Sequence, residues 1–403
     1  MHVLRLCSVY EAPPDSLRGR RGFDVVGGMQ IHTARLTAEL DALGVEQTVI
    51  TAYRPGAPRV ESVGERSRVI RAGVRVRRFR QLYGIAAIPQ VARIGGVDLV
   101  HVHLGEDLAI APLARWAASR AGAPLVVTVH CSVRHTLAHH DPRSAILRAI
   151  GGPAEAGLLR AAQAVLVLSD RLADQLAASG VPRSLLHVVP LGIDLVALRE
   201  PRPRPAAMGG RRWVVFAGRL VPEKGVRDLV AAFAMVSTPD VGLLLVGEGA
   251  DRARLEQLAR GHGVDDRVRF VGSVPHPDIP AYLGHAELVV LPSWYEERGR
   301  ILLEAMAAGA PVVAARTGGI PASVRDGVNG LLVPPRRPEA LAAAIDRVLL
   351  DGALAASMRA AGRATASAHS VPALAGVSLT TYGAVLRRAA EGRRERVGLV
   401  EAG

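Results

Sequence analysis

The sequence predicts an α/β protein of two domains, each a doubly wound and mostly parallel sheet. Short β-branched runs alternate with longer Ala- and Leu-rich stretches of helical periodicity, which is typical of consecutive βαβ units. The chain has 403 residues, too many for one ordinary core and suitable for two domains of roughly 180 residues. Length and alternation therefore predict the same architecture.

The first half of the chain gives the N-terminal domain, residues 1–197. Its predicted strands cover residues 3–9, 47–51, 74–79, 99–103, 125–129, 164–168 and 187–189, and its predicted helices cover 29–43, 108–121 and 171–178. Residues 198–212 are rich in Pro, Gly and Arg, a composition that disfavours regular structure. We therefore predict an irregular linker there.

The alternation begins again after the linker and gives a C-terminal domain over residues 213–379. Its predicted strands cover 213–217, 241–246, 268–271, 288–291, 311–314 and 331–333, and its predicted helices cover 225–235, 251–260, 301–308 and 338–350. In such sheets ligands bind beyond the carboxyl ends of the strands, so functional motifs are expected directly after them.

Composition narrows the class of protein. Apolar residues make up 49% and charged residues 22%, a balance typical of a soluble globular chain, and no apolar run reaches the length of a membrane span. The opening MHVLRLCSVY lacks the features of a signal peptide. With only Cys7 and Cys131, a disulfide framework is not expected. These features favour the cytoplasm.

The net charge is +13, which raises the question of an anionic partner. The cations are scattered, with local clusters at 68–80, 199–212 and 387–396, and aromatic residues are only 3% of the chain. This is too few for base-stacking surfaces. We therefore expect an Arg-rich solvated surface and no nucleic-acid partner.

Glycines and cations follow predicted strands in both halves. Gly27 and Gly28 precede the first helix, where they would let backbone approach an anion, although a plain turn has the same composition. In FAGRLVPEKG, residues 216–225, Arg219 and Lys224 follow a strand. A guanidinium and an ammonium suit a diphosphate, whereas the alternative is an ordinary charged surface loop.

Two glutamates mark the segment SWYEERGRILLEAMAAGAPVV, residues 293–313. Glu296 lies in the loop and Glu304 about one turn inside the following helix, with Gly299 between them. Carboxylates accept hydrogen bonds from hydroxyls, so both suit a sugar and a ribose. A solvated Glu pair is the alternative, and the apolar runs on either side disfavour it.

The chain resembles glycosyltransferase family 4 over essentially its whole length. The resemblance rests on GGMQIHTARLTAELDALGVEQTVIT, DLVHVH, LVVTVHC, VVPLGID, GRLVPEKG and PSWYEERGRILLEAMAAGAPVV, in that order. It implies a GT-B fold, two Rossmann-like domains facing across a cleft, with a C-terminal helix near 380–391 packing back on the first domain. It also implies transfer from a nucleotide diphosphate-sugar with retention of configuration and without a required metal or other cofactor.

The resemblance also implies a role for each matching residue. Arg219 and Lys224 would hold the donor diphosphate, Glu296 a donor-sugar hydroxyl and Glu304 the ribose. His130 would help align the anomeric carbon. The remaining donor-site residues are Gly27, Gly28, Ser273, Val274 and His276, with the last three lining the base, and Gly299, Arg300, Ile301 and Leu302, whose N–H groups would face the sugar or phosphates.

Three residues depart from the family pattern. Glu297 and Arg298 stand where the family has Gly and often an aromatic, which leaves the choice of donor sugar open. Leu191 replaces a commonly polar residue.

Other histidines and glycines offer alternatives. His135 and His139 have metal-ligand spacing and lie beside His140, but no HExxH pattern exists, so acceptor-site lining or surface exposure competes with zinc. His101 and His103 would lie on one strand face and shape a cleft floor. GEGADR, residues 247–252, lacks the third glycine of a nicotinamide fingerprint.

A closer resemblance connects HVLRLCSVYE and VTVHC with the aminocyclitol glycosyltransferases of aminoglycoside antibiotic biosynthesis. It implies transfer of a hexose or N-acetylhexosamine, from UDP-GlcNAc or UDP-Glc, to 2-deoxystreptamine. Since that acceptor is a polycation, we expect carboxylates around it, and the candidates are Asp24, Glu106, Asp107 and Asp141.

Two alternatives remain open. An inositol lipid or other cell-envelope acceptor would need peripheral membrane contact, which the basic residues of 71–80 could provide. A non-catalytic nucleotide-sugar sensor would bind without turnover, but the full set of donor-site residues disfavours it.

Overall fold

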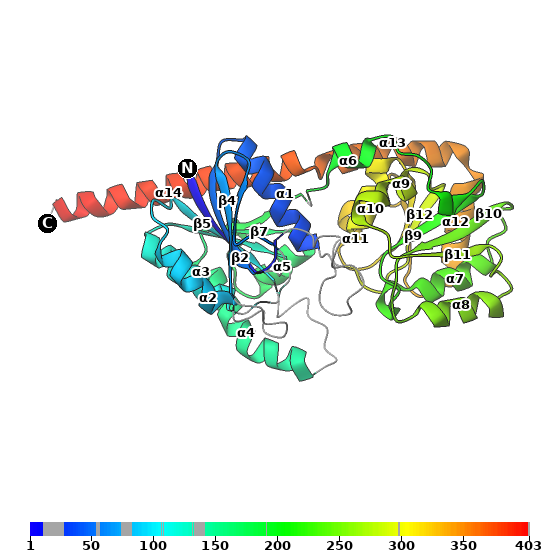
Figure 1. Ribbon diagram of the computed structural model, residues 1–403, viewed down its shortest axis with the longest axis horizontal. Helices are drawn as coiled ribbons and strands as arrows, with labels where there is room; N and C mark the ends of the chain where they lie inside the picture. The colour runs from blue at the N-terminus through cyan, green and yellow to red at the C-terminus, as the bar shows by residue number, and fades with distance from the viewer. Residues whose placement is uncertain are drawn as a thin grey trace. The chain divides into compact units, whose positions relative to one another are not determined.

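The computed structural model describes residues 1–10, 28–53, 57–73, 83–105, 107, 109–130, 132, 142–190, 192–296 and 299–401. The chain forms two compact units, which we call unit 1 (Met1–Gly192 with Val371–Gly403) and unit 2 (Ile193–Ser370). Each unit contains one sheet with helices packed on it (Figure 1). The predicted α/β class with parallel sheets is confirmed.

Unit 1 has an eight-stranded sheet in the order β3-β4-β2-β1-β5-β6-β7-β8, parallel except for β3 against β4. The strands are β1 (His2–Cys7), β2 (Glu46–Ala52), β3 (Val60–Val63), β4 (Ser67–Ala72), β5 (Leu99–Leu104), β6 (Leu125–Val129), β7 (Ala164–Val167) and β8 (Leu186–Val188). The helices are α1 (Gly28–Ala42), α2 (Tyr83–Ala92), α3 (Ile110–Ala121), α4 (Pro142–Ala161), α5 (Asp170–Ala178) and α14 (Val371–Glu401), with a 3-10 turn at Arg183–Leu185.

The two faces of this sheet differ in chemistry. On β1, Leu4 and Leu6 pack into an apolar core with α2 and α3, whereas Arg5 and Cys7 alternate with them and lie on the other face. That other face is covered by α1 and α14, which lie side by side (Figure 1). Beneath them the sheet carries buried polar residues, namely Arg5, Gln47, His101, His103 and Thr128. A parallel sheet is usually apolar on both faces, so this polar layer is unusual.

Unit 2 has a six-stranded, entirely parallel sheet in the order β11-β10-β9-β12-β13-β14. The strands are β9 (Arg212–Ala217), β10 (Val241–Val246), β11 (Val268–Gly272), β12 (Leu288–Leu291), β13 (Val312–Ala315) and β14 (Leu331–Val333). The helices are α6 (Leu195–Arg199), α7 (Val226–Ala234), α8 (Arg252–Gly261), α9 (Ile279–Gly284), α10 (Arg300–Ala308), α11 (Ile320–Ser323), α12 (Pro338–Leu350) and α13 (Gly352–Ala368), with 3-10 turns at Ala206–Met208, Pro222–Lys224 and His276–Asp278.

The structure corrects several predicted elements. The segment predicted as an irregular linker, 198–212, holds the end of α6 and a 3-10 turn. Asp194 caps α6 by accepting from the Ala197 N–H at 3.0 Å, and the Trp213 indole N–H donates to the Met208 carbonyl at 2.6 Å, so side chains fix both. The predicted strand 74–79 lies outside the described residues. The strands β3 and β4, and the helices α2, α4 and α13, were not predicted.

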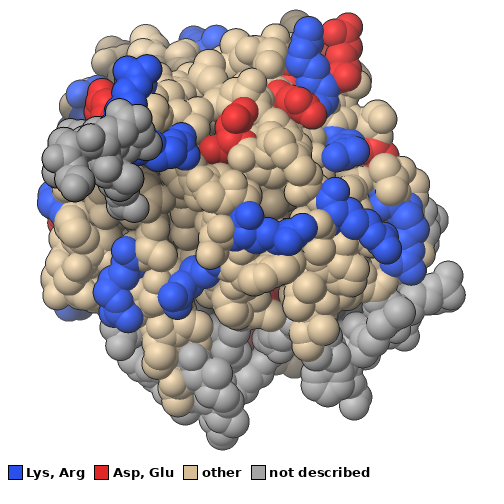
Figure 2. Space-filling model, turned by 90° about the vertical axis from the view of Figure 1, so that its left-hand side faces the viewer, with Lys and Arg blue, Asp and Glu red and all other residues tan. Residues whose placement is uncertain are grey.

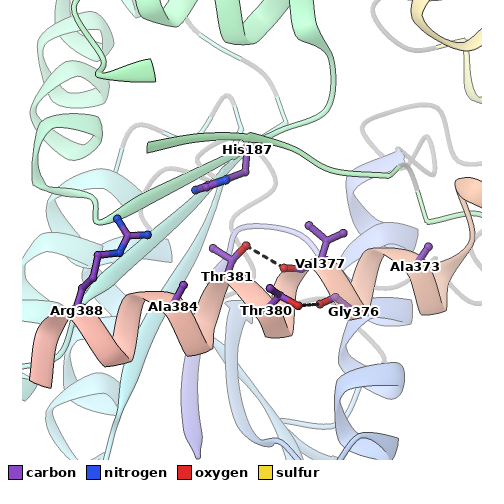
Figure 3. A pocket seen from close by; sticks show the side chains of 8 residues that line it. All are labelled: His187, Ala373, Gly376, Val377, Thr380, Thr381, Ala384 and Arg388. Atoms are coloured by element: carbon purple, nitrogen blue, oxygen red, sulfur yellow. Dashed lines mark hydrogen bonds between the residues drawn. The ribbon is translucent and has the colours of Figure 1, made fainter. Parts of the chain in front are cut away.

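Helix α14 is longer than the predicted 380–391, and an open cavity of about 500 Å³ lies between it and β8 (Figure 3). The hydroxyls of Thr380 and Thr381 donate to helix carbonyls at 2.9 Å, so the helix itself uses them. His187 and Arg388 are the titratable groups lining it, and none of the predicted site residues does. We therefore do not take this cavity as the functional site.

On the face that Figure 2 shows, the cations are scattered, as expected from the sequence. Lys and Arg stand there in several separate groups with other residues between them. Among the described helices, none has the length and apolar character needed to cross a bilayer.

Tyr382 of α14 connects that helix to the polar layer. Its ring is fully buried, its hydroxyl lies 2.6 Å from His101 Nδ1, and burial raises its pKa to about 12. The hydroxyl is therefore neutral at physiological pH and available for this hydrogen bond.

We predict that Tyr382→Phe lowers the free energy of unfolding of the protein by roughly 1–3 kcal/mol, because a buried imidazole nitrogen loses its partner. Urea denaturation measures this. Tyr282→Phe is the matched control, since Tyr282 is also buried but makes no hydroxyl hydrogen bond within the described chain, and its change should stay within about 0.5 kcal/mol. Equal effects for the two variants would contradict the role given to the Tyr382 hydroxyl.

Candidate functional site

The candidate site of unit 2 lies where its strand order reverses. From β9 the chain builds β10 and β11 on one side and then crosses to β12, β13 and β14 on the other. At such a switch point the loops after the two central strands diverge and leave room for a ligand. The two motif loops predicted from sequence, 218–225 and 292–299, follow β9 and β12 directly.

Close backbone contacts fix these two loops against each other. Gly225 has φ +63°, and a Cβ there would lie 2.2 Å from the Pro292 carbonyl oxygen, so only glycine fits. The Trp294 N–H donates to the Glu223 carbonyl at 2.9 Å. Lys224 and Glu296, 72 residues apart, consequently meet in an ion pair between Nζ and Oε2. Each side chain is about four-fifths buried, so the pair is well shielded from solvent.

Arg219 occupies the same loop as Lys224 but is more than half exposed. Its Nη2 lies 3.6 Å from Glu223 Oε1, and an exposed pair of this kind contributes little to stability. The backbone around it is closely packed, since a Cβ on Gly247 would lie 1.8 Å from the Gly218 carbonyl oxygen. The first glycine of GEGADR thus packs directly against the loop that carries Arg219.

Glu304 forms a second cluster in unit 2. Helix α10 begins after Gly299, whose φ is +57°, and Glu304 is buried one turn inside it. Glu304 Oε1 accepts from Arg300 Nε at 2.8 Å, and His276 Nε2 lies 3.9 Å away. The segment that follows β11 therefore approaches the first turns of α10.

The remaining predicted donor-site residues of unit 2 differ in how deeply they are buried. Ser273 is exposed, and Val274 and Ile301 are half-buried. Leu302 is fully buried, and its N–H donates to the Gly299 carbonyl at 2.8 Å, so that N–H is already used within the helix start.

Gly318 is a residue of this site that sequence reasoning missed. A Cβ there would lie 2.0 Å from the Glu296 carbonyl oxygen, and the Gly319 N–H donates to the same oxygen at 3.0 Å. Gly318 therefore fixes the backbone of Glu296. The signal available in the sequence was TGG, residues 317–319, which is separated from the end of β13 by one residue.

Unit 1 contributes a cluster of buried histidines near its own switch point, between β1 and β5. His130 directly follows β6, and its N–H donates to the Leu104 carbonyl at 2.9 Å. His130 Nε2 lies 3.0 Å from His103 Nδ1, and His103 Nε2 lies 2.7 Å from Arg5 Nη2. The ring of His32 packs edge-on against both His103 and His130, with centroids 5.9 and 4.7 Å away.

Burial keeps the inner histidines of this cluster neutral. The pKa values of His101 and His103 lie well below the usual value, chiefly because both rings are fully desolvated. Neighbouring charge, from Arg5 and from the other imidazoles, lowers them further. His32 was not identified from sequence, because its place beside His130 depends on how α1 packs on the sheet.

Ring nitrogens of His32, His103 and His130 lie within 4.8 Å of one another, which raises the question of a metal ion. The residues do not fit one well. His103 Nε2 is hydrogen-bonded to the Arg5 guanidinium. A divalent cation held by His103 would therefore lie close to a buried positive charge, which would repel it.

The predicted acceptor-site residues are only partly described. Asp107 is buried, and its Oδ1 accepts from the Ala109 N–H at 3.0 Å at the entry to α3. Gly28 is the first residue of α1. The residues that lie outside the described part of the chain are Asp24, Gly27, Glu106, Cys131, His135, His139, His140, Asp141, Leu191, Glu297 and Arg298.

Family models match both halves of the chain. Residues 27–192 match the glycosyl transferase 4-like domain, and residues 199–365 match the glycosyl transferases group 1. Among solved structures, the chain is similar to sucrose-phosphate synthase from Thermosynechococcus elongatus, with TM-score 0.72, 26% identity, and coverage of 99% and 100% of the two chains. It also shares the fold of Anabaena Alr3699/HepE in complex with UDP, with TM-score 0.71, 22% identity, and coverage of 95% and 100%.

Relatives of similar length are known. The chain is 35% identical to the 2-deoxystreptamine N-acetyl-D-glucosaminyltransferase of Streptomyces fradiae, covering 94% of each. It is 34% identical to the 2-deoxystreptamine glucosyltransferase of Streptomyces kanamyceticus, covering 89% of this chain and 99% of the relative. It is 30% identical to the D-inositol 3-phosphate glycosyltransferase of Jonesia denitrificans, covering 90% and 91%. The chain therefore belongs to the group 1, family 4-like glycosyltransferases, and its two α/β units are the two domains of a GT-B fold.

Proposed function

We propose that this glycosyltransferase moves a hexose or N-acetylhexosamine from UDP-Glc or UDP-GlcNAc to an aminocyclitol such as 2-deoxystreptamine, with retention of configuration. The observation that carries the proposal is the identity of 35% and 34%, over most of the chain, to two enzymes named for 2-deoxystreptamine. The sugars in their names differ, so the donor sugar is the less constrained half of the proposal.

The donor half of the site uses the residues of unit 2. Arg219 and Lys224 hold the diphosphate, and Glu296 accepts a hydrogen bond from a hydroxyl of the donor sugar. In the ligand-free protein the Lys224–Glu296 pair satisfies both charges in a shielded place. The entering diphosphate takes over Lys224, which releases Glu296 for the sugar hydroxyl.

The rest of the donor is held around α10. Glu304, oriented by Arg300, binds the ribose hydroxyls, and Ser273, Val274 and His276 line the base. The N–H groups of Gly299, Arg300 and Ile301 stand at the start of α10, where the helix dipole favours negative charge. The sequence positions Gly27 and Gly28 are included in the proposed donor site as well, because glycines would let backbone N–H groups approach an anion.

The transfer needs no protein nucleophile in this proposal. The bond from the anomeric carbon to the β-phosphate oxygen breaks, and its electron pair leaves with UDP. The acceptor oxygen bonds to the same face of the carbon, and its hydroxyl proton passes to the departing phosphate oxygen. Arg219 and Lys224 stabilise the charge that develops on that oxygen, while His130 aligns the sugar. No metal or other cofactor takes part.

The acceptor half uses carboxylates, because 2-deoxystreptamine carries ammonium groups at physiological pH. Asp24, Glu106, Asp107 and Asp141 are the proposed partners. We place the reaction in the cytoplasm, with no nucleic-acid partner and no lasting membrane contact. The second candidate acceptor is an inositol-type polyol, free or on a membrane lipid, and the identity to a D-inositol 3-phosphate glycosyltransferase favours it.

We predict that Lys224→Ala lowers kcat by about 10²- to 10³-fold, because charge on the leaving diphosphate loses its cation. Glu296→Gln should lower kcat/KM by roughly 10- to 100-fold. The measurement is mass-spectrometric turnover of 2-deoxystreptamine with a panel of UDP-, GDP- and dTDP-sugars. Arg212→Ala is the control, since Arg212 is exposed at the opposite end of β9. Full activity in both site variants would remove this cluster from the proposal.

We also predict that Glu106→Gln with Asp107→Asn raises the KM for 2-deoxystreptamine at least about tenfold and leaves the KM for the donor unchanged. The Asn side chain keeps an oxygen that can accept from the Ala109 N–H, so the turn into α3 is preserved. An unchanged acceptor KM would remove this pair. Transfer to inositol phosphate or to inositol-lipid vesicles, in place of 2-deoxystreptamine, would favour the second acceptor class.

A further inference from the structure

Arg5 is a fully buried cation with neutral partners. Its Nη1 donates to Thr37 Oγ1 at 2.6 Å, to Gln47 Oε1 at 3.1 Å and to the Thr33 carbonyl at 3.4 Å, and its Nη2 contacts His103. Within the described chain no carboxylate pairs with it. Burying a charge costs free energy of desolvation. In return, the Arg5 guanidinium supplies hydrogen-bond donors that an apolar side chain lacks.

The contact with His103 has a fixed direction. A guanidinium has only donors, so His103 Nε2 must accept and cannot carry a proton. A neutral imidazole has one N–H, which therefore sits on His103 Nδ1. That N–H points at His130 Nε2, 3.0 Å away, which must in turn accept.

His103 is held in its neutral form, which carries a single proton on the ring nitrogens. Its ring is fully buried, and its pKa is held well below the usual value by burial and by the surrounding imidazoles and Arg5. A second proton on His103 would place an N–H against the Arg5 guanidinium. The ring therefore has a single proton and a single orientation for it.

We infer that Arg5 and His103 are positioning residues that fix His130 as the tautomer with its proton on Nδ1. His130 then offers a hydrogen-bond donor, and not an acceptor, at that nitrogen. The ligand group it suits is an oxygen with free lone pairs, such as a hydroxyl of the bound sugar. The choice of a sugar hydroxyl rests on the proposed role of His130 at the donor sugar, whereas the assignment of the tautomer does not.

Asn or Gln at position 103 would each keep one of the two hydrogen bonds that His103 makes, with Arg5 on one side and with His130 on the other. The amide nitrogen of Asn can take the place of Nδ1 and donate to His130, but it does not reach Arg5. The longer Gln side chain can take the place of Nε2 and accept from Arg5, but it offers no donor to His130. His103→Asn should therefore preserve the state of His130, and His103→Gln should lose it.

The experiment is nitrogen-15 NMR of the histidine rings in the full-length protein, with the His130 signals assigned by their loss in His130→Gln. In the wild type we expect a protonated Nδ1 and an unprotonated Nε2. His103→Asn should keep that spectrum and kcat/KM within about threefold, while His103→Gln should shift His130 toward the Nε2–H form and lower kcat/KM about 10- to 100-fold. His187→Gln, outside the cluster, is the matched control.

Several results would overturn the inference. One is a wild-type His130 protonated on Nε2, which requires no variant to fold. Another is one equivalent of zinc in the purified protein, bound through His32, His103 and His130. Equal behaviour of the Asn and Gln variants would do the same. If the spectrum is as expected but His130→Gln transfers sugar at the full rate, the assignment of the tautomer stands and the proposed role of His130 fails.

Discussion

The buried polar layer of the first domain is built around a cation, Arg5, that no carboxylate of the described residues pairs with. Arg5 sits at the centre of β1, fully buried, and the protein stabilises it with neutral oxygens and one imidazole nitrogen. These partners are a hydroxyl and a backbone carbonyl from α1, an amide oxygen from β2 and an imidazole from β5. From Arg5 the hydrogen bonds continue through His103 to His130, directly beyond the carboxyl end of β6.

The second domain positions its functional side chains in a different way. There the functional side chains are placed by backbone contacts at glycines, with Gly225 against Pro292 and Gly318 against Glu296. No side chain larger than hydrogen fits at either contact, so both positions require glycine. The contact at Gly225 brings the two loops close enough for Lys224 and Glu296 to form their ion pair.

The sequence predicted the parts of the site that are continuous in the chain. Lys224 and Glu296 lie in loops after short apolar runs that were predicted as strands, and Glu304, eight residues after Glu296, was predicted about one turn inside the following helix. Arg5, His32 and Gly318 were not identified, because their roles depend on strand register and helix packing. Arg5 even sits within a run predicted as a buried strand, where nothing local reveals its partners. The hairpin of β3 and β4 was missed because its exposed positions break the apolar pattern.

We propose that the enzyme transfers a sugar to an aminocyclitol with retention of configuration. The most direct test is proton NMR of the product that the wild-type enzyme forms from 2-deoxystreptamine and UDP-GlcNAc or UDP-Glc, whose sugars are α-linked. Attack on the face that UDP leaves predicts an α-glycoside, recognised by the small coupling between the protons on the first and second sugar carbons. A β-glycoside would contradict retention, and intact 2-deoxystreptamine with either donor would contradict the proposed acceptor.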